Sequence, residues 1–342
     1  MSQPAPPDSD TPRPLPRRPA PRPQAARANR PPFQPLDAVW SVVLAALSLT
    51  VLQAIWGLAV THAAGSASAA GIVAGLYLLG WRTRDRAAGV SAGLLAATSL
   101  PFLHTAAYSP QSAAFTLLTV AALFAFVAGS SLAALGLAAV ATIIRPDGLL
   151  LGLLLLGLSF AQQRRRALIG TAIFLVPIFA FWLIRFEMGY GLPLLPDIGL
   201  HPTSALWLWS PGAALLVWFL LPLCAEMSEP MRRARWLPVI LWAVLYLAGS
   251  CLYSLTNPAA MLLPLMAVLF ALAGGGLSRL LPAMGGEVPT PMLRYVLATL
   301  AVIAFVGLHI RLEMPVSTSP TPVSGIRSEP AAPAGTPVQS GN

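Results

Sequence analysis

The residues best suited to chemistry stand in one short stretch, Arg145-Pro146-Asp147-Gly148, between the apolar runs Ser131–Ile144 and Leu149–Phe160. An ionised side chain inside a bilayer is costly unless it is paired or reaches water. A planar guanidinium matches phosphate oxygens bidentately, which makes Arg145 the best candidate anion ligand of the chain. The stretch therefore predicts either an anion-binding corner that faces a lipid phosphate, or a solvated turn at the membrane surface.

Asp147 allows more than one role beside Arg145. Its carboxylate could orient the guanidinium, bind a divalent cation or act as a base. Its simplest role is to cap the helix that begins at Gly148, because Asp is a preferred N-cap residue. We expect capping from the position alone, and we keep Asp147 as the first catalytic candidate.

Further polar residues gather in two other stretches, at 104–111 and 185–204. Asp197 and His201 are too loosely spaced in a Pro- and Gly-rich segment to imply a metal site, and we predict none. Arg185 and Glu187 fit an interfacial ion pair, with Glu187 as a second catalytic candidate. The remaining candidates for substrate binding are His104, Tyr108, Arg185, Tyr190 and His201.

The composition identifies the class of protein. Of the 342 residues, 56% are hydrophobic and 10% are charged, whereas a soluble domain carries about 25% charged residues. Many windows reach the roughly 20 apolar residues that a spanning helix needs, and the alternating strands of a barrel are missing. We predict an all-α polytopic membrane protein. The net charge of +9 lies in a tail and short loops, so we expect membrane lipids and no nucleic acid as partners.

The two ends differ from the apolar middle. Residues 1–35 are rich in Pro and Arg, and residues 313–342 are rich in Pro, Ser and Thr. Neither segment has enough apolar surface to fold, so we expect two disordered tails around a transmembrane domain at 36–312. The Arg residues of the first tail favour a cytoplasmic location near anionic headgroups.

Clusters of Arg set the predicted topology. The segments 82–86, 164–166 and 232–235 are expected to be cytoplasmic loops, because Arg is enriched on that side. About eleven transmembrane helices then alternate correctly in the cytoplasmic membrane of a bacterium, with the N-terminus inside. The Arg145 corner and the stretches 104–111 and 185–204 fall on the outer face. The runs that flank Arg145 are short for a span, so one or both could be re-entrant or tilted.

The order of several motifs carries a family resemblance. Tyr108-Ser109-Pro110-Gln111, followed two helices later by Arg145-Pro146-Asp147-Gly148, resembles the middle of GT-C superfold glycosyltransferases, in the mannosyltransferase-like and aminoarabinose-transferase-like branches. In that family an Arg-Pro-Glu/Asp-Gly turn opens the next helix. Residues 186–196 and 257–266 look like its Tyr-Gly-x-x-x-Pro loop and its Arg-Tyr-x-x-Pro segment. The resemblance covers about residues 90–280.

The resemblance implies a GT-C-like scaffold and sugar transfer from a polyprenyl-phosphate donor on the outer face. Arg145 would bind the donor phosphate, and Asp147 or Glu187 would supply the acid. The family's first outer loop carries an acidic residue, whereas residues 62–66 hold none, and Ala259 and Ala260 replace its Arg-Tyr pair. The alternative is therefore a non-catalytic accessory or assembly subunit with a membrane-protein partner. The sequence names no cofactor.

Overall fold

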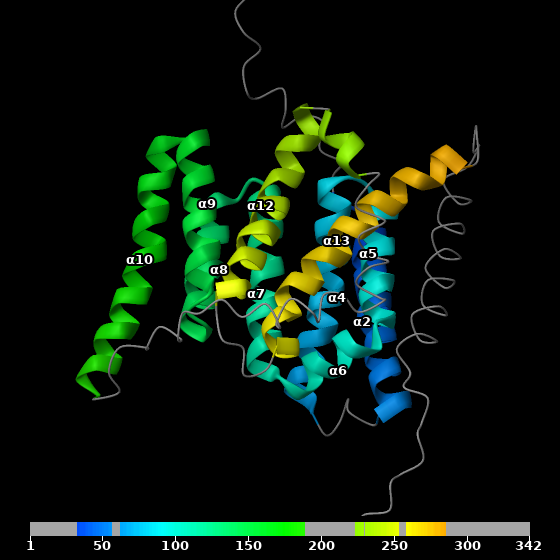
Figure 1. Cartoon of the computed structure of the whole chain (residues 1–342), viewed down its shortest axis with the longest axis horizontal. Helices are drawn as coiled ribbons and strands as arrows, with labels where there is room; N and C mark the ends of the chain where they lie inside the picture. The colour runs from blue at the N-terminus through cyan, green and yellow to red at the C-terminus, as the bar shows by residue number, and fades with distance from the viewer. Residues whose placement is uncertain (1–32, 57–61, 189–222, 229, 253–257, 285–342) are drawn as a thin grey trace, which may run out of the picture.

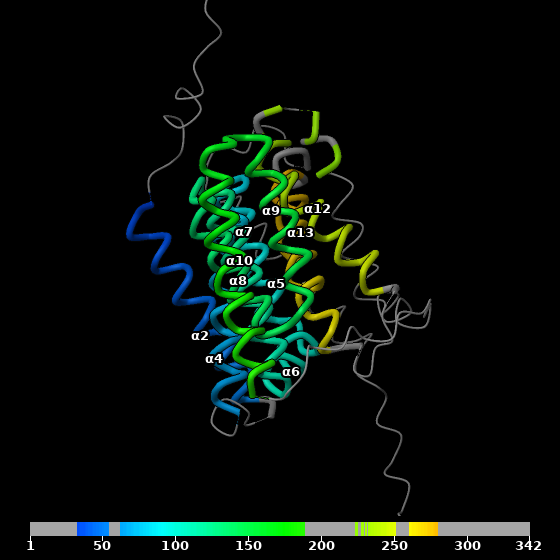
Figure 2. The backbone as a smooth tube through the Cα atoms, turned by 90° about the vertical axis from the view of Figure 1, so that its left-hand side faces the viewer, coloured from blue at the N-terminus to red at the C-terminus, as the bar shows by residue number. Residues whose placement is uncertain are grey.

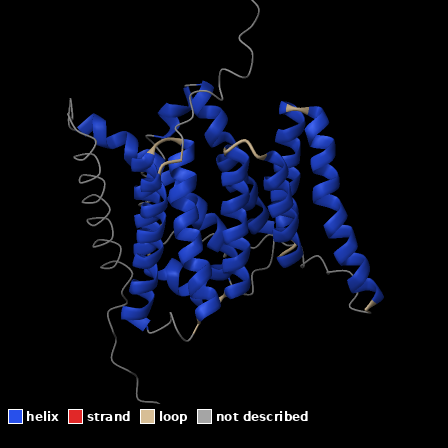
Figure 3. Cartoon of the chain, turned by 180° about the vertical axis from the view of Figure 1, so that it is seen from behind, coloured by secondary structure: helices blue, strands red, loops and turns tan. Residues whose placement is uncertain are grey.

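The computed structural model describes residues 33–56, 62–188, 223–228, 230–252 and 258–284. Within these ranges the chain forms helices and no strand, which confirms the all-α prediction (Figure 3). A 3₁₀ turn at Ala225–Ser228 precedes the last two helices. The helices are α2 (Pro35–Trp56), α4 (Ala63–Thr83), α5 (Arg86–Thr98), α6 (Leu100–Tyr108), α7 (Pro110–Val127), α8 (Ser131–Ile144), α9 (Gly148–Gln162), α10 (Arg164–Glu187), α12 (Pro230–Leu252) and α13 (Pro258–Met284).

Five of the described helices are long and apolar enough to cross a membrane. They become six if α5 and α6, which meet at an angle of 68°, are one broken span. Helices α8 and α9 have only 14 and 15 residues. The chain is thus an all-helical protein with several candidate membrane spans, whereas the predicted eleven spans stay a prediction. The stretches expected to form the eighth and eleventh spans lie almost wholly outside the described residues.

Most of the helices lie roughly parallel or antiparallel to one another, whereas α13 crosses the front of the bundle at an angle (Figure 1). The apolar window of α13 is 83% buried, whereas those of α2 and α10 are 22% buried. Helix α10 lies at one edge of the bundle and packs on α8 and α9. Seen from the side, α2 and α12 lie on opposite flanks (Figure 2). The core is therefore built around α4, α5, α7 and α13.

Small residues let the central helices approach closely. A Cβ added to Gly274 of α13 would lie 2.7 Å from both the carbonyl oxygen of Ala88 and the backbone nitrogen of Ala92 on α5. In a membrane, lipid tails are as apolar as the side chains, so burial of apolar surface does not drive helices together. Close contacts between backbones, which small residues allow, stabilise the packing instead. The many Gly and Ala residues of these segments thus specify helix packing and not flexibility.

The three Arg-rich segments lie at one end of the bundle. The end of α4, the turn from α9 to α10 and the start of α12 are all at the top of Figure 1. Arg84 donates to the carbonyl oxygen of Gly275 at 3.3 Å, which ties this end of α4 to α13. Residues 164–166 and 232–235 were expected in loops, but they form the first turn of α10 and the first turns of α12. An Arg side chain on an exposed first turn of a helix reaches water just as one on a loop does, so Arg residues do not distinguish the two.

A buried ion pair at this end was not anticipated from the sequence. The carboxylate of Asp37 on α2 is inaccessible to solvent and accepts from Arg86 Nε at 2.7 Å and Nη2 at 3.2 Å. It also accepts from the hydroxyl of Tyr77 at 3.0 Å and from the backbone N–H of Gln34 at 2.9 Å. This network joins the peripheral α2 to α4 and α5. It is a structural contact, because Asp37 is fully engaged.

Candidate functional site

The corner between α8 and α9 has the backbone that its sequence demands. Arg145 is extended, with φ −144° and ψ 133°, as expected of a residue before Pro. Helix α8 therefore ends at Ile144, and α9 begins at Gly148. A Cβ on Gly148 would lie 2.4 Å from the backbone nitrogen of Thr142, so only Gly lets the two helices meet this closely.

Arg145 is buried, with 6% of the whole residue exposed, and its side chain points into the protein. Its Nη2 forms an ion pair with Asp147 Oδ2. The same nitrogen donates to the hydroxyl of Tyr246 at 3.2 Å and to the sulfur of Met261 at 2.8 Å. The interpretation of this corner as a solvated surface turn is therefore wrong, because the guanidinium is held between α12 and α13.

Asp147 does not play the capping role that its position suggested. Its backbone is helical, with φ −57° and ψ −23°, and its side chain makes no capping hydrogen bond to α9. The carboxylate contacts Arg145 instead, because a hydrogen bond from a buried, charged guanidinium is stronger than one from a neutral backbone N–H at a helix end. Of the roles considered for Asp147, the structure has the one that orients Arg145.

The other edge of the guanidinium is less fully engaged. Among the described residues, the contact of Nη1 is a hydrogen bond of 3.4 Å to Ser112 Oγ, which is long for a charged donor. The ring of Phe115 lies 4.6 Å from Cζ, in cation–π range. Gln111 fastens the corner by donating to the carbonyl oxygen of Ile144 at 3.0 Å. The Nη1 edge is thus where a further anion would find a donor.

Tyr246 joins the three helices around Arg145. Its ring is 5% exposed and stacks on Trp242 at 4.8 Å between centroids. Its hydroxyl donates to the carbonyl oxygen of Met261 at 2.6 Å while it accepts from Arg145. Sequence reasoning missed Tyr246, Met261 and Ser112, because they reach Arg145 from distant helices. The signal that the sequence offered was Tyr246 itself, because a tyrosine hydroxyl within the apolar run of α12 needs a hydrogen-bond partner.

Three helices begin at this corner. Ser112 lies in the first turn of α7 and Met261 in the first turn of α13, and α9 starts directly after Asp147. None of these first turns holds an acidic residue, and neither Ser109 nor Asp147 makes a side-chain cap on α7 or α9. Each helix N-terminus carries roughly +0.5 charge. The C-termini of α6 and α8 and the carboxylate of Asp147 offset part of this positive charge. Among the described residues the guanidinium and the three N-termini still leave the corner with a net positive potential.

The two helices that meet at the corner are shorter than a bilayer is thick. Helices α8 and α9 have 14 and 15 residues, so each is about 21–23 Å long. The hydrocarbon core of a bilayer is about 30 Å thick. Helix α8 begins and α9 ends at the Arg-rich end of the bundle, so two helices of this length that reach one membrane surface would leave Arg145 several ångström below the other.

His104 and Tyr108 lie together, apart from the contacts of Arg145. The stretch 104–111 was expected to be a loop, but it is the end of α6 and the start of α7, with Ser109 between them. The ring of Tyr108 lies 4.5 Å from that of His104 and 4.5 Å from that of His62. Tyr108 is 52% exposed. The chain returns to a helix directly after Ser109, because Pro110 is tolerated in the first turn of α7.

Arg185 and Glu187 belong to α10 and not to the loop in which we expected them. Side chains two positions apart on a helix do not face each other, which disfavours the proposed pairing. The guanidinium of Arg185 lies 5.8 Å from the ring of Phe181. The structure shows no contact that brings Glu187, an exposed residue, to Arg145. Tyr190 and His201 lie outside the described residues.

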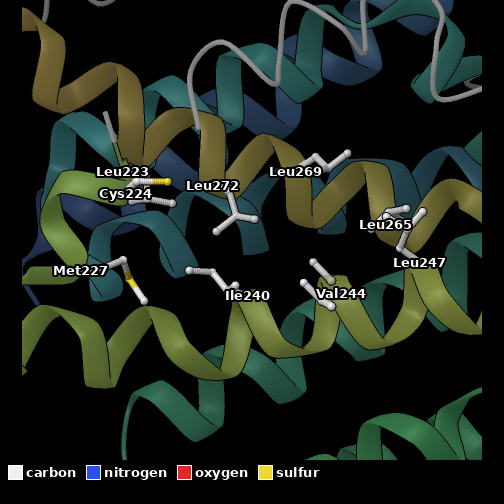
Figure 4. Close-up of a pocket in the computed structure, with 10 residues that line it drawn as sticks. Leu223, Cys224, Met227, Ile240, Val244, Leu247, Leu265, Leu269 and Leu272 are labelled. Atoms are coloured by element: carbon white, nitrogen blue, oxygen red, sulfur yellow. The ribbon is translucent and has the colours of Figure 1, made fainter. Parts of the chain in front are cut away.

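An apolar groove separates α12 from α13 (Figure 4). Its volume is about 340 Å³. Leu247 and Leu265 lie at one end, and Leu223, Cys224 and Met227 lie at the other. Leu247 directly follows Tyr246, and Leu265 is one turn beyond Met261. The groove therefore begins beside the two residues that hold Arg145.

Comparison with protein-family models, curated proteins and solved structures finds no match for the chain. The resemblance to GT-C glycosyltransferases therefore rests on the motifs and remains a prediction.

Proposed function

We propose that the chain is a GT-C-like membrane glycosyltransferase that binds a polyprenyl-phosphate-linked sugar at the Arg145 corner. The observation that carries this proposal is the excess of positive potential there. A buried guanidinium and the N-termini of α7, α9 and α13 lie there, against the carboxylate of Asp147 and the C-termini of α6 and α8. Phosphate is the anion that both an Arg fork and a helix N-terminus recognise.

The ligand must be amphiphilic to reach this corner. Arg145 is buried, and the groove beside it is lined by apolar side chains. A soluble sugar nucleotide has no part that suits such surroundings. A sugar phosphate carried on an isoprenoid lipid has a charged head for the corner and an apolar chain for the membrane. This match supports the lipid-linked donor over a soluble one.

In the proposed reaction the acceptor hydroxyl attacks the anomeric carbon of the sugar. The bond from that carbon to the phosphate oxygen breaks, and polyprenyl phosphate leaves with its electron pair. Asp147 takes the hydroxyl proton, since it is the acid nearest to the phosphate site. Glu187 is a weaker candidate, because it lies on the last turn of the peripheral α10.

The second candidate function is a non-catalytic accessory or assembly subunit that works with a membrane-protein partner. It is favoured by the way Arg145 is already satisfied by Asp147, Tyr246 and Met261. The short first outer segment also lacks an acid. In this case the protein would bind the lipid-linked sugar phosphate but would not transfer the sugar from it.

We place the protein in the cytoplasmic membrane of a bacterium, with its N-terminus inside. The support is that the three Arg-rich segments share one end of the bundle. The Arg145 corner is near the opposite end and would face the outer leaflet. This is the side on which a lipid-linked donor presents its sugar in the proposed reaction.

Release of polyprenyl phosphate from the donor tests the function. The purified protein is reconstituted with a panel of polyprenyl-phosphate hexoses and membrane acceptors, and the freed lipid phosphate is measured. The proposal predicts release that Arg145→Ala and Asp147→Asn abolish. Binding of the donor without release, in wild type and in all acceptor mixtures, would instead support the accessory subunit.

A further inference from the structure

We propose that the groove between α12 and α13 holds the first isoprenoid units of the donor lipid. This inference rests on the proposed function and assigns the binding site of the lipid chain. The lining side chains recur every three or four residues on the facing sides of both helices. They are Ile240, Val244 and Leu247 on α12, and Leu265, Leu269 and Leu272 on α13.

The groove has the size and lining of a ligand site. Its volume of about 340 Å³ falls within the usual range for small-molecule pockets. All ten residues that line it are apolar or weakly polar, and seven of them are Leu, Ile or Val, which have branched side chains (Figure 4). Methyl-branched isoprenoid units match such walls, and burial of each methylene contributes about 0.8 kcal/mol.

The groove is open on one side. Val244 is 61% exposed and Leu247 is 38% exposed, so the α12 wall borders the surroundings of the bundle. In a membrane these surroundings are lipid, and a chain can enter sideways without crossing water. A closed cavity would require the bundle to open first.

The direction of the groove matches that of a lipid. Its Leu247 and Leu265 end adjoins Tyr246 and Met261, which contact Arg145. From there it follows seven residues of α12 back to Ile240, about 10 Å toward the Arg-rich end of the bundle. A lipid with its phosphate at Arg145 therefore has its chain running inward from the outer leaflet.

Binding of two probes to the full-length protein in detergent tests the assignment. The probes are a long-chain polyprenyl monophosphate and methyl phosphate, which has the head but no chain. Ala243→Phe fills the groove, and Val244→Phe narrows it at an exposed position where folding is not at risk. Ala248→Phe is the matched control, since Ala248 is exposed on α12 and does not line the groove.

We expect both groove variants to weaken polyprenyl phosphate binding by about tenfold or more and to leave methyl phosphate binding unchanged. Ala248→Phe should bind both probes as wild type does, whereas Arg145→Ala should lose both. Wild-type binding of the long lipid by Ala243→Phe and Val244→Phe would overturn the groove assignment alone. Equal competition by phosphatidic acid would also overturn it. Failure of the wild type to bind either probe would overturn the proposed function.

Discussion

Arg145 and Asp147 are two residues apart in the chain, and their side chains form an ion pair at the turn from α8 to α9. The side chain of Arg145 is 7% exposed and that of Asp147 is 15% exposed. The carboxylate thus occupies one donor edge of the guanidinium, on the side nearer to solvent. An incoming phosphate must share Arg145 with Asp147 or displace it.

Asp147→Asn should therefore have opposite effects on binding and on transfer. Removing one of two neighbouring anions relieves a repulsion of about 1–2 kcal/mol, so polyprenyl phosphate should bind roughly five- to thirtyfold more tightly. Transfer should be lost, because an amide cannot take the acceptor proton. Titration of the lipid and the release assay measure the two effects. Weaker binding by Asp147→Asn would show that the carboxylate supports the anion site and does not compete for it.

The close approach of α8 and α9 makes a sharp prediction for two glycines of one helix. Gly148→Ala should destabilise the protein by about 1–3 kcal/mol, because the new methyl group meets the backbone of Thr142 at 2.4 Å. Gly157→Ala is the control, since a Cβ there meets nothing within 4 Å. It should stabilise α9 by about 0.5–1 kcal/mol. Thermal unfolding in detergent compares them, and equal effects would contradict the packing at the corner.

The ion pair of Asp37 and Arg86 should hold α2 on the bundle. Arg86→Ala leaves a carboxylate without its charged partner and should cost about 1.5–3 kcal/mol. Adding Asp37→Asn to this variant should restore part of the loss, because the unpaired charge is removed. Arg233→Ala, at an exposed position, should change stability by less than about 0.5 kcal/mol. Thermal unfolding reports all three, and additive losses in the double variant would argue against the pair.

Labelling of single cysteines tests the predicted orientation. In a variant with Cys224 and Cys251 replaced by Ala, a cysteine at exposed Ala64 should react with a membrane-impermeant maleimide in intact cells. A cysteine at exposed Ser130, in the turn from α7 to α8, should react only after permeabilisation. The reverse pattern would place the Arg145 corner on the cytoplasmic side.

Local features of the chain were predictable from its sequence. Hydropathy identified the helical class, and Pro146 with Gly148 marked the corner, so the expected run Ser131–Ile144 coincides with α8. Polar residues misled the prediction at 104–111, 164–166, 185–187 and 232–235, which lie almost wholly within the ends of helices. Polarity reports that a residue reaches water, and the first and last turns of a membrane helix reach water too.

Contacts between distant segments were not predictable. Asp37 lies in the first apolar run and Arg86 in an expected loop, and only the packing of α2 brings them together. In the same way Tyr246 and Met261 reach Arg145 from 101 and 116 residues away. Periodicity and composition describe one segment at a time. The partners of a buried charge depend on which helices become neighbours.

Binding of polyprenyl phosphate by Arg145 variants tests the central claim most directly. Dissociation constants are measured for polyprenyl monophosphate and for the neutral polyprenol with wild type, Arg145→Lys and Arg145→Ala. We predict that the phosphate is preferred by wild type and that Arg145→Ala loses about 1.5–3 kcal/mol of its binding. Arg145→Lys should lose less, because it keeps the charge but not the fork. Binding of the phosphate by both variants as tightly as by wild type would show that the corner is only a structural turn.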